Sequence, residues 1–117
     1  MKWNVERKHP RVRVNVPGEL RCPTESFPRR AQTNTLSLGG CYVEMVETLE
    51  VNSHMDVILW LDGIKVRAWA EVVCNHPHVG NGIKFVRIAD ADRQKLVDFL
   101  QTAAKRSGFP FKTVSGV

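Results

Sequence analysis

The chain has 117 residues, the size of one ordinary domain, and 43% of them are hydrophobic, so a packed core is possible and wholesale disorder is excluded. No apolar run approaches the ~20 residues that span a bilayer, and the charged residues 1–13 contain no apolar signal segment, so we expect a soluble cytoplasmic protein without membrane contact. The net charge of +5 lies largely in residues 2–13 and around Arg29 and Arg30, which suits either a phosphate-bearing partner or a merely solvated basic surface.

Residues 1–12 are polar and basic, and Pro10 interrupts any helix there, so we expect a flexible N-terminal arm. Valines alternate with polar residues over positions 12–16, which predicts the first strand. The Pro17-Gly18 pair is expected to break or bulge this strand before it continues to Cys22. The folded domain is therefore expected to begin at residue 13, directly after the arm.

Five further segments have the alternation or the β-branched content of strands. They cover residues 31–36, 41–45, 56–61, 64–74 and 83–88. A turn at residues 37–40 separates the first two segments, and the Asp62-Gly63 pair predicts a tight hairpin between the next two. The turn-rich residues 76–82 precede the last segment. Many short strands joined by turns indicate an antiparallel β-barrel.

The end of the chain has a different character. Residues 89–105 contain neither glycine nor proline, and their apolar residues recur at helical spacing. Lys105 and Arg106, followed by Gly108, are typical of the end of a helix. The sequence thus predicts a mainly β fold, in which a barrel and a C-terminal α-helix occupy residues 13–106 and a flexible tail covers residues 107–117.

Three segments carry the candidate chemistry. Arg7 and Arg11 form an R-x-x-x-R pattern in the arm, residues 35–40 read T-L-S-L-G-G at a turn, and residues 80–85 read G-N-G-I-K-F at the last strand. In this order and spacing they resemble the PilZ family of cyclic di-GMP receptors. That family pairs an RxxxR arm with a [D/N]xSxxG turn, and a GxGxxF-like strand often precedes its C-terminal helix. The resemblance covers roughly residues 6–100 and implies a six-stranded antiparallel PilZ-type β-barrel.

The resemblance also implies a function, that of a bacterial cytoplasmic receptor for cyclic di-GMP that needs no metal and no other cofactor. An arginine fork binds either a phosphate or the N7 and O6 edge of guanine bidentately. The ligand-binding residues implied are Arg7, Lys8 and Arg11 in the arm, and Thr35, Ser37, Gly39 and Gly40 at the turn. An arm that closes over the ligand would change conformation, and we expect an unidentified downstream protein to detect that change.

One position departs from the family pattern. Thr35 stands where the family has Asp or Asn, while an asparagine occurs one residue earlier, at Asn34. Because adjacent side chains of a strand face opposite ways, Asn34 does not replace Thr35 without a slip in register. Thr35 keeps a hydroxyl but lacks the reach of an amide, and a lost bidentate contact to a base costs about 1–3 kcal/mol. The alternative is therefore a degenerate PilZ-like interaction module that does not bind the nucleotide.

Other functional classes have less support. Trp60 and Trp69, together with the basic charge, allow a nucleic-acid-binding barrel. The basic residues cluster at a motif and do not track a long groove, so we rank nucleic acid last among the partners. The sequence contains no Ser-His-Asp order, paired-carboxylate site, Walker loop or metalloprotease helix, so we do not expect an enzyme.

The cysteines and histidines do not indicate a metal site. The three cysteines are an odd number without a CxxC pair, which favours reduced, mostly buried thiols over disulfides. Cys74, His76 and His78 are close in sequence, but a zinc ion usually needs three or four ligands in fixed geometry, and Pro77 hinders local wrapping. We expect a core cysteine followed by exposed turn histidines.

Overall fold

The computed structural model describes residues 10–107 of the chain. Its elements in chain order are β1 (Val12–Arg13), β2 (Pro17–Arg21), β3 (Arg29–Leu36), β4 (Gly40–Glu44), β5 (His54–Leu61), β6 (Ile64–His76), β7 (Gly80–Ile88) and α2 (Asp90–Ser107). Every strand pairing is antiparallel. Strands therefore dominate the described part of the chain, and one long helix follows them.

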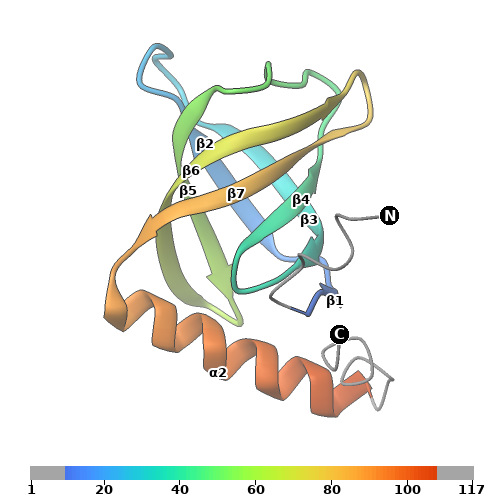
Figure 1. Ribbon diagram of the computed structural model, residues 1–117, viewed down its shortest axis with the longest axis vertical. Coiled ribbons are helices and arrows are strands. Elements are labelled where there is room, and N and C mark those ends of the chain that lie inside the picture. Colours follow the sequence, from blue (N-terminus) through green and yellow to red (C-terminus); the bar gives the residue numbers. More distant parts are fainter. Residues whose placement is uncertain (1–9, 108–117) are drawn as a thin grey trace.

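Six of the strands close into a barrel, which can be followed in Figure 1. Their order around the barrel is β3-β2-β5-β6-β7-β4, and the pairing of β3 with β4 closes the ring. Strand β1 lies outside the ring and pairs with β3. Closure satisfies the hydrogen-bonding groups that would otherwise line two sheet edges. The prediction of a six-stranded antiparallel barrel with a C-terminal helix is confirmed.

The core fills the inside of this barrel. Alternate strand residues point inward, and Leu36, Met55, Ala70 and Val72 are fully buried. Helix α2 lies across one end of the barrel, where it packs against β6 and β1 (Figure 1). Its Leu96 side chain is also fully buried. No helix in residues 10–107 combines the length and the apolar character that crossing a bilayer requires.

The first strand is interrupted earlier than the sequence predicts. β1 covers only two residues, and Pro17 and Gly18 already belong to β2, so the predicted break at that pair is wrong. Both strands pair with β3, but Val12 faces Leu36 whereas Pro17 faces Gln32, which shifts the register by one residue. The irregularity therefore falls in residues 14–16, before the proline. Pro17 is tolerated because it is the first residue of its strand.

The buried side chain of Thr33 accommodates this irregularity. Its hydroxyl accepts a hydrogen bond from the Val16 amide at 2.9 Å and donates one to the Val14 carbonyl at 2.7 Å. The Thr33 amide in turn donates to the Val16 carbonyl at 3.0 Å. One threonine thus satisfies backbone groups that the interrupted ladder leaves without strand partners.

The second half of the barrel has longer strands than predicted. β6 extends to His76 and β7 begins at Gly80, so the turn between them comprises only residues 77–79. Gly80 lies in a strand because β4 passes close to it, and an added Cβ would lie 2.3 Å from the Val43 carbonyl oxygen. The predicted hairpin at Asp62-Gly63 is confirmed, with φ angles of 53° and 84° that match a type I′ turn.

Candidate functional site

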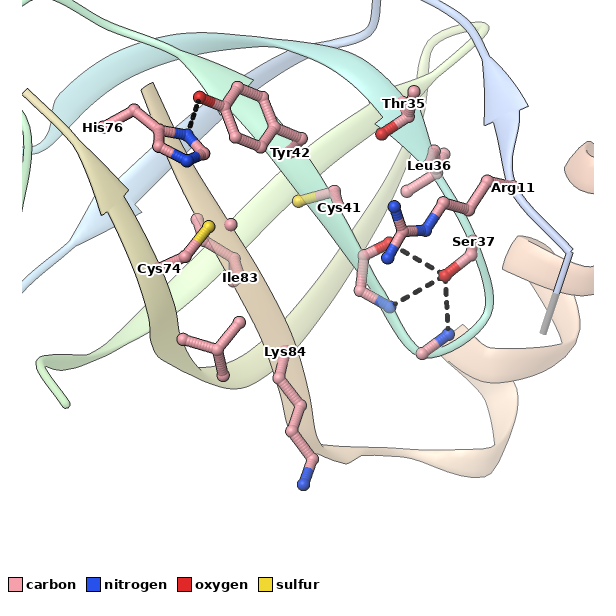
Figure 2. A pocket seen from close by; sticks show the side chains of 14 residues that line it. Arg11, Thr35, Leu36, Ser37, Cys41, Tyr42, Cys74, His76, Ile83 and Lys84 are labelled. Atoms are coloured by element: carbon pink, nitrogen blue, oxygen red, sulfur yellow. Dashed lines mark hydrogen bonds between the residues drawn. The ribbon is translucent and has the colours of Figure 1, made fainter. Parts of the chain in front are cut away.

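A cavity of about 410 Å³ lies on the side of the barrel formed by β4, β7 and the end of β6. Figure 2 shows the residues that line it. They include five of the seven predicted binding residues, namely Arg11, Thr35, Ser37, Gly39 and Gly40. The other two, Arg7 and Lys8, lie outside the described residues. The fold thus brings the start of β1 and the 37–40 turn to one pocket.

The 37–40 turn is held by its own serine. The Ser37 hydroxyl accepts hydrogen bonds from the Gly39 and Gly40 amides, each at 3.2 Å, and lies 3.3 Å from the Gly40 carbonyl oxygen. The Ser37 amide donates to the same carbonyl at 2.8 Å. Ser37 is buried, so this hydroxyl sets the shape of the turn. The Phe85 amide donates to the Gly39 carbonyl at 2.9 Å and fixes the turn to β7.

Gly40 is explained by the packing of β4 on β7. A Cβ at this position would lie 2.1 Å from the Ile83 carbonyl oxygen, which no real side chain tolerates. The barrel therefore requires a glycine at position 40 whether or not a ligand approaches it. The same close approach brings Ile83 and Lys84 of β7 to the wall of the pocket.

The pocket is electropositive in character. Arg11 is exposed just before β1, and Figure 2 shows its guanidinium over the turn, beside Ser37. Lys84 also lines the pocket, although its side chain extends away from the turn (Figure 2). None of the lining residues in the described part of the chain is acidic. An anion in this cavity would therefore meet the positive charges of Arg11 and Lys84.

A β-bulge in β3 lies at the position where the family motif is altered. In the pairing with β4, Thr33 faces Val43 and Thr35 faces Tyr42, so Asn34 is the extra residue. Thr33 is buried, whereas Asn34 is exposed and Thr35 is half-buried, so two adjacent side chains avoid the core. Thr35 lines the pocket.

Asn34 does not join Thr35 in the pocket. Its Nδ2 atom instead donates a hydrogen bond to the Glu44 carboxylate at 3.0 Å. The bulge at Asn34 provides the slip in register that Asn34 would need to take the place of Thr35. The side-chain amide of Asn34 is nevertheless directed to Glu44 of β4. Thr35 is therefore the residue that this chain presents at the altered position of the motif.

The end of the pocket opposite Arg11 is formed by residues to which the sequence patterns assigned no ligand-binding role. Tyr42 of β4 and His76 of β6 meet there, with Tyr42 Oη 2.8 Å from His76 Nδ1. Their ring centroids are 5.7 Å apart, and the ring planes differ by 34°. Burial raises the pKa of the Tyr42 hydroxyl, and the nearby Cys74 and Glu44 raise it further. The phenol therefore keeps its proton near neutral pH and is available for hydrogen bonding.

The histidines differ in position, contrary to expectation. His78 lies in the turn between β6 and β7, but His76 is the last residue of β6 and lines the pocket. Among the described residues, no group of three or more His, Cys, Asp or Glu side chains could hold a metal ion. No sequence signal linked His76 to Tyr42, because the two residues are 34 positions apart and meet only in the closed barrel.

The cysteines and tryptophans contribute little polar chemistry here. Cys41 and Cys74 line the pocket as free thiols, and burial raises the pKa of Cys41 to about 12. Trp60 and Trp69 do not line it. Trp69 instead stacks on His54, with centroids 6.1 Å apart and planes at 20°. A base-stacking role for these tryptophans would thus lie outside this pocket.

Comparison with family models identifies one family, and comparison with solved structures shows a shared fold. The family model described as PilZ domain matches residues 6–102. The similar solved structures include MotI/DgrA, an inhibitor of motility from Bacillus subtilis, at 19% identity and a TM-score of 0.70, covering 86% of this chain and 51% of that one. The PilZ domain of CeSA from a cellulose-synthesizing bacterium is 20% identical with a TM-score of 0.58, covering 83% of this chain and 97% of that one.

YcgR from Escherichia coli, solved in complex with c-di-GMP, is 13% identical with a TM-score of 0.72, covering 86% of this chain and 47% of that one. The chain thus spans about half the length of MotI/DgrA and of YcgR. At these identities the likeness to the solved structures shows the shared fold. The comparison with curated protein sequences gave no match.

Proposed function

This chain belongs to the PilZ domain family, and on that premise we propose that it is a receptor that binds cyclic di-GMP in the pocket beside the 37–40 turn. The observation that carries the proposal is the convergence of Arg11, Thr35 and the turn on one cavity. The complex of YcgR with c-di-GMP supports the choice of ligand, because YcgR has the same fold. The proposed role is binding and signalling, with no catalytic step.

The chemistry of the pocket suits this ligand. Cyclic di-GMP carries two phosphates and two guanines, so it offers anionic oxygens and the acceptor atoms N7 and O6. Arg11 can bind either kind of group through its planar fork. The cavity of about 410 Å³ lies within the range typical of small-molecule sites. Cys41 and Ile83 supply apolar surface against which a base or a ribose can pack.

The arm supplies the remaining part of the proposed site. Arg7 and Lys8 lie outside the described residues. The RxxxR spacing supports a second guanidinium contact from Arg7, and we assign a weaker phosphate contact to Lys8, which stands between the two arginines. We take residues 1–12 as the arm, 13–106 as the PilZ-type β-barrel with its C-terminal helix and 107–117 as the tail. Closure of the arm over the ligand creates a new surface, which a partner protein in the bacterial cytoplasm detects.

Isothermal titration of the full chain with cyclic di-GMP tests this proposal. The wild type should bind, and Arg11→Ala and Arg7→Ala should abolish the heat of binding, while Lys8→Ala should have a much smaller effect. Arg13→Ala is the matched control, because Arg13 is exposed on β1 two residues further on and does not line the pocket. Absence of heat with the wild type at ligand concentrations of tens of micromolar would contradict the proposal.

A second candidate function follows from Thr35. Because this residue lacks the amide or carboxylate of the family motif, the chain could act as a degenerate module that only contacts other proteins. Titration of Thr35→Asn separates the two functions. Binding by the wild type excludes the degenerate module, whereas binding by the variant alone supports it.

A further inference from the structure

The binding pocket has a second end, which the RxxxR and [D/N]xSxxG motifs do not describe. Tyr42 and His76, called the ring pair below, stand there, and Figure 2 shows them on the side of the cavity away from Arg11 and Ser37. We propose that the ring pair is a base-stacking subsite that receives the second guanine of cyclic di-GMP. This inference rests on the proposed function, because it places the other half of that ligand.

The ring pair is built across β7, which lies between β4 and β6 in the barrel. Tyr42 faces Gly82 in the β4–β7 ladder, and His76 faces Gly80 in the β6–β7 ladder. The strand between the two rings therefore presents bare backbone. A Cβ added to Gly80 would lie 2.7 Å from Tyr42 Cε1 and 3.0 Å from Tyr42 Oη. Gly80 thus leaves the space that the Tyr42 ring occupies, while Gly82 leaves space for Cys74, whose Sγ atom would lie 2.6 Å from an added Cβ.

A hydrogen bond holds the two rings as one surface. Tyr42 Oη and His76 Nδ1 are 2.8 Å apart, and the ring planes are inclined by only 34°. Each ring restrains the other, so less side-chain freedom is lost when a flat ligand group binds. Tyr42 is half-buried, so its ring is held in place by its surroundings, and His76 is exposed, so its ring is accessible to a ligand. This is the arrangement of a preformed stacking platform.

The two ends of the pocket match the two halves of the ligand. Arg11 offers a cationic fork beside the 37–40 turn, which suits one phosphate or one guanine edge. A cyclic dinucleotide carries its bases on opposite sides of the phosphodiester ring, so the second base points away from the first. The ring pair occupies that direction, and an aromatic face can stack on a purine base.

The experiment compares the full chain with His76→Asn and with the matched control His78→Asn. His78 lies two residues further on, does not line the pocket and has a φ of 66°, which asparagine tolerates. Loss of the ring at position 76 should raise the Kd for cyclic di-GMP about tenfold, and the control should leave it unchanged. Proton NMR of the wild type should show the His76 ring signals shifting on saturation with cyclic di-GMP, while those of His78 stay in place.

The outcomes separate the two claims. Wild-type binding with an equal Kd for both variants overturns the subsite and leaves the receptor function intact. A weakened His76→Asn with no movement of the His76 ring signals also overturns it, because the ring would then act only through the fold. Absence of wild-type binding overturns the receptor function and the subsite together. Tyr42→Phe, which keeps the ring and removes the hydrogen bond, should weaken binding less than His76→Asn.

Discussion

At the scale of single residues, Asn81 joins three parts of the barrel. It is fully buried in β7, where its Oδ1 atom accepts from the Leu49 amide at 2.8 Å. Its Nδ2 atom donates to the Leu49 carbonyl at 2.8 Å and to the Cys74 carbonyl at 3.1 Å. The segment between β4 and β5 is thereby fixed to the opposite strands. The middle residue of the Gly-Asn-Gly motif thus has a structural role that needs no ligand.

Replacing Asn81 with alanine should lower the free energy of unfolding by about 3 kcal/mol, because buried backbone groups of Leu49 lose their partner. Urea denaturation measures this loss. Asn75→Ala is the control, since Asn75 Oδ1 is buried without a hydrogen-bond partner in the described structure. The control should cost less than about 1 kcal/mol. Equal losses for the two variants would contradict the role assigned to Asn81.

Cys41 makes the stability of the fold depend on pH in the alkaline range. Burial raises the pKa of its thiol from 9.0 to about 12. Above pH 9 the unfolded chain loses this proton while the folded chain keeps it, so folding stability decreases as the pH rises toward 12, by up to about 1.4 kcal/mol per pH unit. Below pH 9 this contribution is constant.

Chemical denaturation of the wild type and of Cys41→Ala between pH 8 and about 11 isolates the effect from other groups that titrate there. The difference in unfolding free energy between the two proteins should shrink as the pH rises, because only the wild type carries the thiol. A difference that is independent of pH would show that Cys41 is not the group responsible.

At the scale of the elements, the junction of β1 and β2 depends on Thr33. Substitution by valine keeps the shape of the side chain but removes the bonds to the Val16 amide and the Val14 carbonyl. We expect a loss of about 2 kcal/mol in stability, measured by thermal or urea unfolding. Thr35→Val should reduce the affinity for cyclic di-GMP while leaving stability nearly unchanged, because Thr35 is half-buried and lines the pocket. A Thr33→Val protein as stable as the wild type would contradict the role assigned to the Thr33 hydroxyl.

Elements set by local signals could be predicted from the sequence. The Asp62-Gly63 hairpin needs two positive φ angles in adjacent residues, and this pair provides them. The helical period and the absence of glycine and proline identified α2 to within two residues at its end. The alternation of apolar residues located most of the strands. These signals involve neighbours in sequence, so they can be recognised without the fold.

Features set by contacts between distant strands could not be predicted in this way. Gly80 looks like part of a turn, but it lies in β7 because β4 passes close by. Tyr42 and His76 become neighbours only after β7 is inserted between their strands. The motif located the Arg11 end of the pocket, and closure of the barrel created the other end.

At the scale of the whole molecule, the closed barrel acts as a frame for separate parts of the site. Arg11 precedes β1, which is fixed to β3, while Ser37 follows β3 and His76 ends β6. The three strands that hold these residues in place, β1, β3 and β6, belong to one hydrogen-bonded sheet. A ligand that contacts both ends of the pocket therefore binds only the folded state, and its binding energy adds to the stability of the entire barrel.

This coupling makes the melting temperature a test of the receptor function. Cyclic di-GMP at a hundred times its Kd should stabilise the wild type by about 2.7 kcal/mol, which raises the melting temperature of a domain of this size by on the order of 10 °C. Arg13→Ala should show the same shift, and Arg11→Ala should show none. Circular dichroism at increasing ligand concentration gives the measurement.

The same melting experiment distinguishes a second messenger receptor from a nucleic-acid-binding barrel, because the two ligands differ in charge. An oligonucleotide that contacts many phosphates releases many counterions, so any stabilisation it gives should disappear steeply as salt is raised. Cyclic di-GMP has only two phosphates, and part of its affinity is assigned to stacking on the ring pair and to the turn. Its thermal shift should therefore persist at salt concentrations that abolish the effect of an oligonucleotide. A shift that occurs with the oligonucleotide and not with cyclic di-GMP would reverse the assignment of the ligand and leave the fold as described.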